Sequence, residues 1–181
     1  EQELDWFRDR IKGRYEVKFN GRLGPEPRDH KEVRVLNRVV AWKSDGIHYE
    51  ADPRHAEIII RDLGLQNSNG VVTPCEREDL GKTGSSLKAR DATMYRALVA
   101  RANFLAQDRS DIAFAVKELS RKMSDPQDVD WTCLKRLGRY LRDHPRVIVK
   151  YEYQNHTHAI NGYTDTDWAG CRRTRRSTLG G

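Results

Sequence analysis

The sequence predicts an α+β chain, because residue patterns typical of helices and of strands occupy separate stretches of its 181 residues. Residues 91–142 contain three successive stretches whose apolar residues repeat at helical spacing. Residues 33–50 contain two runs rich in β-branched and aromatic residues around the turn Ser44-Asp45-Gly46. With 37% hydrophobic residues, the chain is able to bury a core. We expect a small hairpin-plus-helix unit, then a three-helix bundle, then further strands.

The first 65 residues predict a helix, a set of strands and a second helix. Apolar residues predict a short amphipathic helix over residues 4–11. Residues 15–19 alternate as a strand does, and residues 33–42 predict a second strand that turns back through residues 47–50. An acid followed by proline then predicts the start of a helix over residues 52–64, which ends at a glycine.

Three helices are predicted after a polar stretch over residues 66–90, which has the composition of a linker. The first helix covers about residues 91–107 and the second residues 110–123, while the third lies between Pro126 and Pro145. The residues expected on their buried faces are Leu98, Val99, Ala102, Leu105, Ala106, Ile112, Ala115, Val116, Leu119, Met123, Trp131, Leu134, Gly138 and Leu141. The chain then returns to strand-like sequence at residues 147–151 and 159–163.

Positive charge is concentrated in the second half of the chain. Residues 1–80 hold 14 Lys and Arg against 16 Asp and Glu, whereas residues 81–181 hold 19 against 11. A basic excess of this kind is typical of a phosphate-backbone partner, although a solvated helix face is the alternative explanation. The residues we expect to contact nucleic acid are Lys135, Arg136, Arg139 and Arg142, with Arg121 and Lys122 as weaker candidates.

The most informative motif is the run Gly162–Gly170, which is followed at once by the basic residues 172–176. Asp165 and Asp167 are two positions apart in a strand-like stretch, so alternation directs both carboxylates to one face. Paired carboxylates beside basic residues suit Mg²⁺-assisted cleavage of a phosphodiester. The alternative is a polar strand end with a solvated hairpin.

The residue sequences of several motifs resemble those of one protein family. Residues 163–170, YTDTDWAG, and residues 175–178, RRST, closely resemble the first strand and hairpin of the RNase H domain in Pol polyproteins of copia-type LTR retrotransposons. Residues 93–99, 109–121 and 131–141 resemble the helical thumb and connection of the same reverse transcriptases. The resemblance covers most of the chain and is strongest after Thr93.

This resemblance implies four parts. Residues 1–65 are the end of the palm-like region of reverse transcriptase, 66–90 a linker, 91–145 the helical thumb or connection, and 146–181 the incomplete start of an RNase H-like mixed sheet. It also implies that Asp165 is the first catalytic carboxylate of RNase H and a ligand of Mg²⁺ in the intact parent. Asp167 is a neighbouring acid and a second candidate ligand.

The family pattern also requires features that this sequence lacks. No Tyr-x-Asp-Asp sequence is present to supply the polymerase carboxylates, and the chain ends at Gly181 before the remaining RNase H ligands. We therefore expect a piece from the middle of a larger polyprotein, whose parent is an RNA-directed DNA polymerase with RNase H. By itself this piece should neither polymerise nor cleave nucleic acid.

Two hypotheses on function follow. In the first, the chain grips a primer–template duplex or RNA–DNA hybrid within the Pol polyprotein, inside the cell, in a cytoplasmic virus-like particle or the nucleus. In the second, it is a decayed or domesticated module that binds nucleic acid or another protein without catalysis. The sequence contains no apolar run long enough to span a membrane, and its three widely spaced cysteines indicate neither a disulfide framework nor a zinc site.

Overall fold

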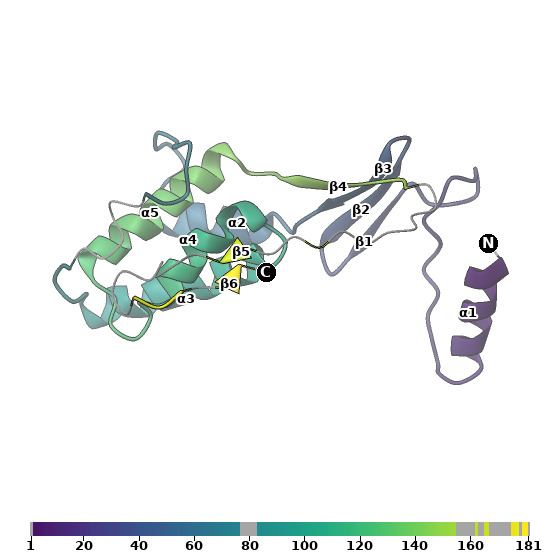
Figure 1. Ribbon diagram of the computed structural model, residues 1–181, viewed down its shortest axis with the longest axis horizontal. Coiled ribbons are helices and arrows are strands. Elements are labelled where there is room, and N and C mark those ends of the chain that lie inside the picture. Colours follow the sequence, from purple (N-terminus) through teal and green to yellow (C-terminus); the bar gives the residue numbers. More distant parts are fainter. Residues whose placement is uncertain are drawn as a thin grey trace.

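The computed structural model describes residues 2–76 and 83–154, together with Gly162 and residues 165–166, 175–177 and 179–180. The elements are α1 (Gln2–Lys12), β1 (Glu32–Val35), β2 (Arg38–Lys43), β3 (Gly46–Glu50), α2 (Arg54–Asp62), α3 (Ala89–Ala106), α4 (Ser110–Ser120), α5 (Asp128–Asp143), β4 (Ile148–Glu152), β5 (Asp165–Thr166) and β6 (Leu179–Gly180) (Figure 1). This mixture confirms the α+β class. Among the described residues, no helix has the length and apolar character needed to cross a membrane.

Helices α2 to α5 form a helical unit around one hydrophobic core (Figure 1). The most deeply buried side chains are Arg109, Tyr95, Ile59, Leu98, Ile112, Leu134, Leu137, Leu141, Val99 and Val116. The inward faces predicted from helical spacing are therefore confirmed, with Ala106, Met123 and Trp131 only partly buried. Gly138 lets the turn after α2 approach α5, since a Cβ there would lie 2.6 Å from a methyl carbon of Leu65 and 3.1 Å from one of Leu63.

Local signals set the ends of these helices. The Asp52 carboxylate accepts a hydrogen bond from the backbone N–H of Arg54 at 3.1 Å, so the predicted acid does cap the first turn of α2. Helix α5 begins after Pro126, and the backbone N–H of Gln127 donates to the carboxylate of Asp130 at 2.9 Å. Both helices thus start where the sequence supplies a polar side chain for the free N–H groups.

The sheet is antiparallel with strand order β1-β2-β3-β4. The sequence analysis expected one strand over residues 33–42, but the structure divides this stretch into β1 and β2. Leu36 and Asn37 form the turn between them, with φ values of 50° and 64°. Two successive residues with positive φ match the right-handed twist of a tight hairpin, which explains the reversal.

Strand β4 pairs with β3, so that Ile47 lies opposite Tyr151. The sequence analysis assigned residues 146–181 to the start of an RNase H-like sheet, whereas residues 148–152 of this stretch complete the β1–β3 sheet in the structure. Gly46, at φ 149°, makes the β3 pairing feasible because a side chain there would collide with the backbone of Tyr151. The sheet therefore joins stretches that are about one hundred residues apart.

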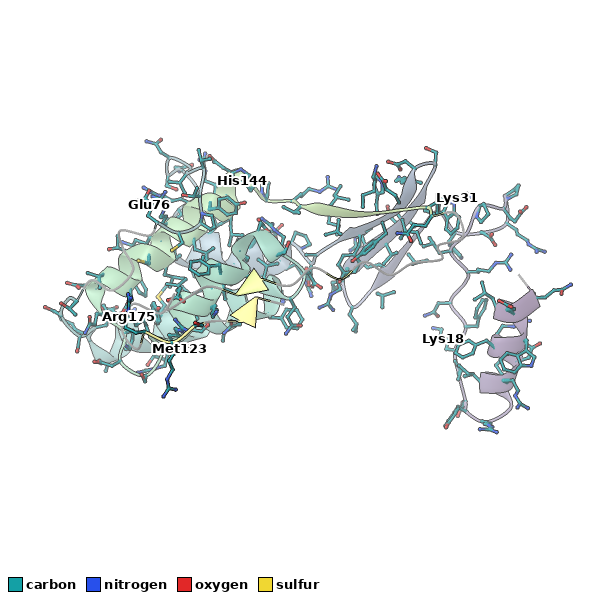
Figure 2. All side chains as sticks on the ribbon, viewed as in Figure 1. Lys18, Lys31, Glu76, Met123, His144 and Arg175 are labelled. Atoms are coloured by element: carbon teal, nitrogen blue, oxygen red, sulfur yellow. The ribbon has the colours of Figure 1, made fainter. Side chains whose placement is uncertain are left out.

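The N-terminal helix α1 forms as predicted, but residues 15–19 do not form a strand. All five are exposed. The Phe19 ring instead lies near α1, 5.9 Å from the Arg8 guanidinium and 5.6 Å from the Lys12 ammonium. Figure 2 shows Lys18 on this returning segment. Within the described ranges no strand pairs with this backbone, which accounts for the missing β-structure.

Candidate nucleic-acid interface

Helix α5 has one face in the core and one face rich in cations. Leu134, Leu137 and Leu141 are fully buried. The basic residues Lys135, Arg136, Arg139 and Arg142 occupy the rest of the helix surface, which we call the basic face of α5. The four leading candidates therefore lie on one helix, but their contacts differ.

Arg136 holds the linker against α5. Its guanidinium donates to the hydroxyl of Thr73 at 2.9 Å and pairs with the carboxylate of Glu76 at 2.5 Å. Only 18% of the side chain is exposed. Figure 2 shows Glu76 on the linker beside α5. Arg136 therefore has a structural role that the sequence analysis did not foresee.

Arg142 makes a second contact to the linker. Its Nε donates to the backbone carbonyl of Gln66 at 3.1 Å, and a terminal nitrogen pairs with Asp143 at 3.1 Å. At the other end of the linker, the backbone N–H of Leu87 donates to the carbonyl of Pro126 at 2.9 Å. The predicted linker is thus a strap along α5, and we use that term for residues 65–76 and 83–87.

The remaining candidates differ in exposure to solvent and in their ionic partners. Lys135 is exposed and makes no ion pair within the part of the chain that the structure describes. Arg139 is half-buried, and its Nε is buried without a hydrogen-bond partner among the same residues. Arg121 pairs with Glu118 at 2.9 Å on the surface, and Lys122 is half-buried. An exposed pair of this kind is weak, so Arg121 can exchange its partner for a phosphate.

A polar joint connects the sheet to the helical unit at Asp108. The Arg38 guanidinium of β2 donates to one Asp108 oxygen at 2.7 Å, and the Tyr49 hydroxyl of β3 donates to the other at 2.6 Å. Arg38 also lies over the ring of Phe104 at 5.4 Å, and that ring packs on His55 at 4.7 Å. The hydrogen bond to Asp108 raises the pKa of Arg38, while burial and the same carboxylate raise the pKa of Tyr49.

A buried arginine ties the α3–α4 loop to the end of α5. Only 2% of Arg109 is exposed, and it donates twice to Asp111, at 2.9 and 2.7 Å, and once to the His144 carbonyl at 3.0 Å. The Tyr140 hydroxyl also donates to Asp111 at 3.0 Å. Burial tends to raise the pKa of Asp111, but the donors outweigh it and the pKa is lowered.

The sequence analysis assigned no role to these polar residues. The motif that resembles reverse transcriptase contains Arg109 and Asp111. Their separation by one residue just before a helix was a signal for a local ion pair, but it did not show that the pair would be buried. Asp108 carried no signal, since both of its partners are more than 50 residues away.

Asp165 lies in β5, where Asp165 pairs with Gly180 and Thr166 with Leu179 in an antiparallel ladder. Asp167 and residues 172–174 lie outside the described residues, and Arg175 to Ser177 are exposed. Among the residues that the structure describes, no three His, Cys, Asp or Glu side chains gather as a metal site would require. The Mg²⁺ role of Asp165 and Asp167 stays a prediction.

The chain has sequence relatives among known proteins. No family model and no solved structure matches the chain. An uncharacterized mitochondrial protein of Arabidopsis thaliana is 32% identical over 130 residues, which make up 70% of this chain and 52% of that protein. Two retrovirus-related Pol polyproteins of the same plant, from transposons RE2 and RE1, are 29% and 30% identical over 144 and 154 residues. The chain is a relative of retrotransposon Pol polyproteins.

The matches cover 79% and 84% of this chain, and they confirm the resemblance to the copia-type Pol family that the motifs indicated. The chain corresponds to about a tenth of each Pol polyprotein and to about half of the mitochondrial protein. The chain is therefore related to one segment of these polyproteins.

Proposed function

We propose that this segment holds a nucleic-acid duplex, a primer–template or an RNA–DNA hybrid, inside a Pol polyprotein by contacts to the phosphate backbone. The observation that carries the proposal is the charge of helices α3 to α5 and their connections. Residues 83–146 hold 13 Lys and Arg against eight Asp and Glu, although this stretch also supplies most of the core. A cationic helical surface binds phosphates without reading the base sequence, which suits a protein that moves along any template.

The contacts of the helical unit refine which residues would bind. Lys135 is the strongest candidate, because it is exposed on α5 and has no ionic partner in the described part of the chain. Arg121 and Lys122 follow at the end of α4. Arg136 and Arg142 hold the strap, so their substitution would disturb the fold as well as any binding.

The RNase H part of the proposal concerns the intact parent. A carboxylate on a strand is a suitable Mg²⁺ ligand, but the described residues supply only Asp165 for it, so they do not form a metal site and we assign no catalytic step to this chain. In the complete polyprotein, Asp165→Asn should abolish removal of the RNA strand and spare DNA synthesis. The purified segment should show neither activity.

The duplex-holding role is tested by the salt dependence of binding to an RNA–DNA hybrid. Substituting Lys135, Arg121 and Lys122 by Gln should flatten the slope of log affinity against log salt by roughly one unit per lost contact. The matched control substitutes three exposed cations of the N-terminal half, Arg10, Arg34 and Lys43, by Gln. Equal slopes for the two triple variants would contradict the proposal, because they would show that only net charge matters.

A second function is favoured by one observation. The mitochondrial relative shares a region of similar extent, yet this region is about half of that protein, so the segment also occurs outside a full-length Pol polyprotein. A decayed or domesticated module, without catalysis, is the corresponding alternative. Absence of hybrid binding by a folded chain at low salt would favour an interaction module over the duplex-holding role.

A further inference from the structure

The β1–β4 sheet has one apolar face and one polar face. Directly paired residues of antiparallel strands point to the same side, so the register assigns every side chain to a face. The apolar face consists of Val33, Val35, Arg38, Val40, Trp42, Ile47, Tyr49, Val149 and Tyr151. The polar face consists of Glu32, Arg34, Val39, Ala41, Lys43, His48, Glu50, Ile148, Lys150 and Glu152.

Among the described residues, no second layer covers most of the apolar face. None of its residues is fully buried, and Tyr151 is 59% exposed. Tyr153 extends the surface next to Trp42, with ring centroids 5.0 Å apart, and is 46% exposed. Among the described elements, a helix reaches this sheet only at Arg38, which lies over the Phe104 ring of α3, and no helix lies across the rest of the face. Figure 1 shows the sheet projecting from the end of the helical unit, with α1 farther out. Sheets with an apolar face normally bury it against a second layer.

Helix α1 also carries an exposed apolar surface. Leu4, Phe7 and Ile11 fall at i, i+3 and i+7 and form one apolar stripe. Leu4 is 59% exposed and Phe7 is 56% exposed, and no residue of the helix is buried. An isolated helix of 11 residues is marginal in water, so α1 needs a surface on which to pack.

We propose that α1 closes over the apolar face of the β1–β4 sheet. The dimensions agree, since 11 helical residues span about 16 Å and four strands span about 15 Å. Residues 13–21 connect α1 to the loop that precedes β1, and they reach about 30 Å when extended. Gly21, at φ 135°, has a backbone conformation that favours glycine.

The composition of the sheet face favours a helix of this chain as its partner over nucleic acid or a second copy of the chain. Nucleic acid would need free cations on the face, but Arg38, its one cation among the described strand residues, is held by Asp108. A second copy of the chain would have to compete with a segment on a short tether, whose effective concentration is about millimolar. The tethered α1 is therefore the favoured partner at ordinary protein concentration.

Hydrogen exchange of the α1 amides tests the closure in the full 181-residue chain. If α1 packs on the sheet, its amides are protected, and Tyr151→Gln on the distant strand β4 should speed their exchange by about tenfold or more, because a large apolar contact is lost. The matched control is Lys150→Gln, the neighbouring residue on the polar face, which should leave α1 unchanged. Unprotected α1 amides, or equal effects of the two substitutions, would overturn the proposal.

Photocrosslinking identifies the occupant. With p-benzoylphenylalanine in place of Phe7, we expect crosslinks to residues 38–50 or 147–153 within the same chain. The same group in place of Asp9, on the opposite side of α1, should not give them. Crosslinks confined to residues 14–20, or a crosslinked dimer, would contradict closure within one chain.

Discussion

The helical unit and the β1–β4 sheet bury their side chains very differently. In the helical unit, α2 to α5 close around one core that includes the fully buried Leu134 and Leu137. In the sheet, Ala41 and Gly46 are the only residues of the four strands that are fully buried. Helices arranged in a bundle cover one another, whereas a single sheet needs a second layer. The comparison indicates that the helical unit is stable by its own packing and that the sheet depends on additional contacts.

The largest expected effect comes from paired core substitutions in the two regions. Leu137→Ala should lower the free energy of unfolding by about 3–5 kcal/mol, because it leaves a cavity in a closed core. Val39→Ala, on the polar face of the sheet, should cost less than about 1 kcal/mol because Val39 is only partly buried. Urea unfolding measures both. Similar losses would show that the sheet also has a packed core.

A second substitution removes the buried cation of the helical unit. Arg109→Met should lower the free energy of unfolding by about 2–3 kcal/mol, because Asp111 and the carbonyl of His144 lose their donor. Part of Asp111 reaches solvent, which reduces the cost. Arg101→Met, at an exposed position of α3, is the control and should be nearly neutral in thermal unfolding.

The joint between the two regions should have an intermediate effect. Asp108→Asn weakens the acceptor that Arg38 and Tyr49 share, and we expect a loss of about 1–2 kcal/mol. It should also uncouple the regions. With Trp6, Trp131 and Trp168 replaced by Phe, the fluorescence of Trp42 and the helical circular dichroism should then follow separate unfolding curves. Coincident curves in this variant would mean that other contacts connect the sheet to the helical unit.

The smallest expected effect is a dependence of stability on pH. The pKa of Asp111 is lowered in the folded chain, since the donors from Arg109 and Tyr140 outweigh burial. Its contribution is therefore full above the unfolded pKa, near 4, and is lost as pH falls through the lower folded pKa. Melting temperatures measured across this range should fall in acid, and less steeply in Asp111→Asn, which should begin lower at neutral pH.

Much of the helical unit was predictable because the apolar pattern of a helix depends on residues only three or four positions apart. The spacing of Ile112, Val116 and Leu119 identified the buried face of α4, and Pro126 and Pro145 bracketed α5. The basic face of α5 was also visible in the sequence. The hairpin at Leu36 and Asn37 was missed, since a leucine at positive φ is not a turn signal.

The candidate interface was predictable only in part. The sequence placed Lys135 and its neighbouring arginines on one helix, but it could not show that Arg136 and Arg142 would hold the strap. An arginine is normally expected in solvent, so the burial of Arg109 had no signal in composition or spacing.

The sequence by itself determined the helices, the location of the basic charge and the resemblance to Pol polyproteins, because each depends on residues close together in the chain. The tertiary structure decided which distant segments meet. It paired β4 with β3, laid the strap along α5 and brought Arg38 and Tyr49 to Asp108. Periodicity states which face of an element is apolar, but the surface that covers this face is chosen by packing among elements far apart in sequence.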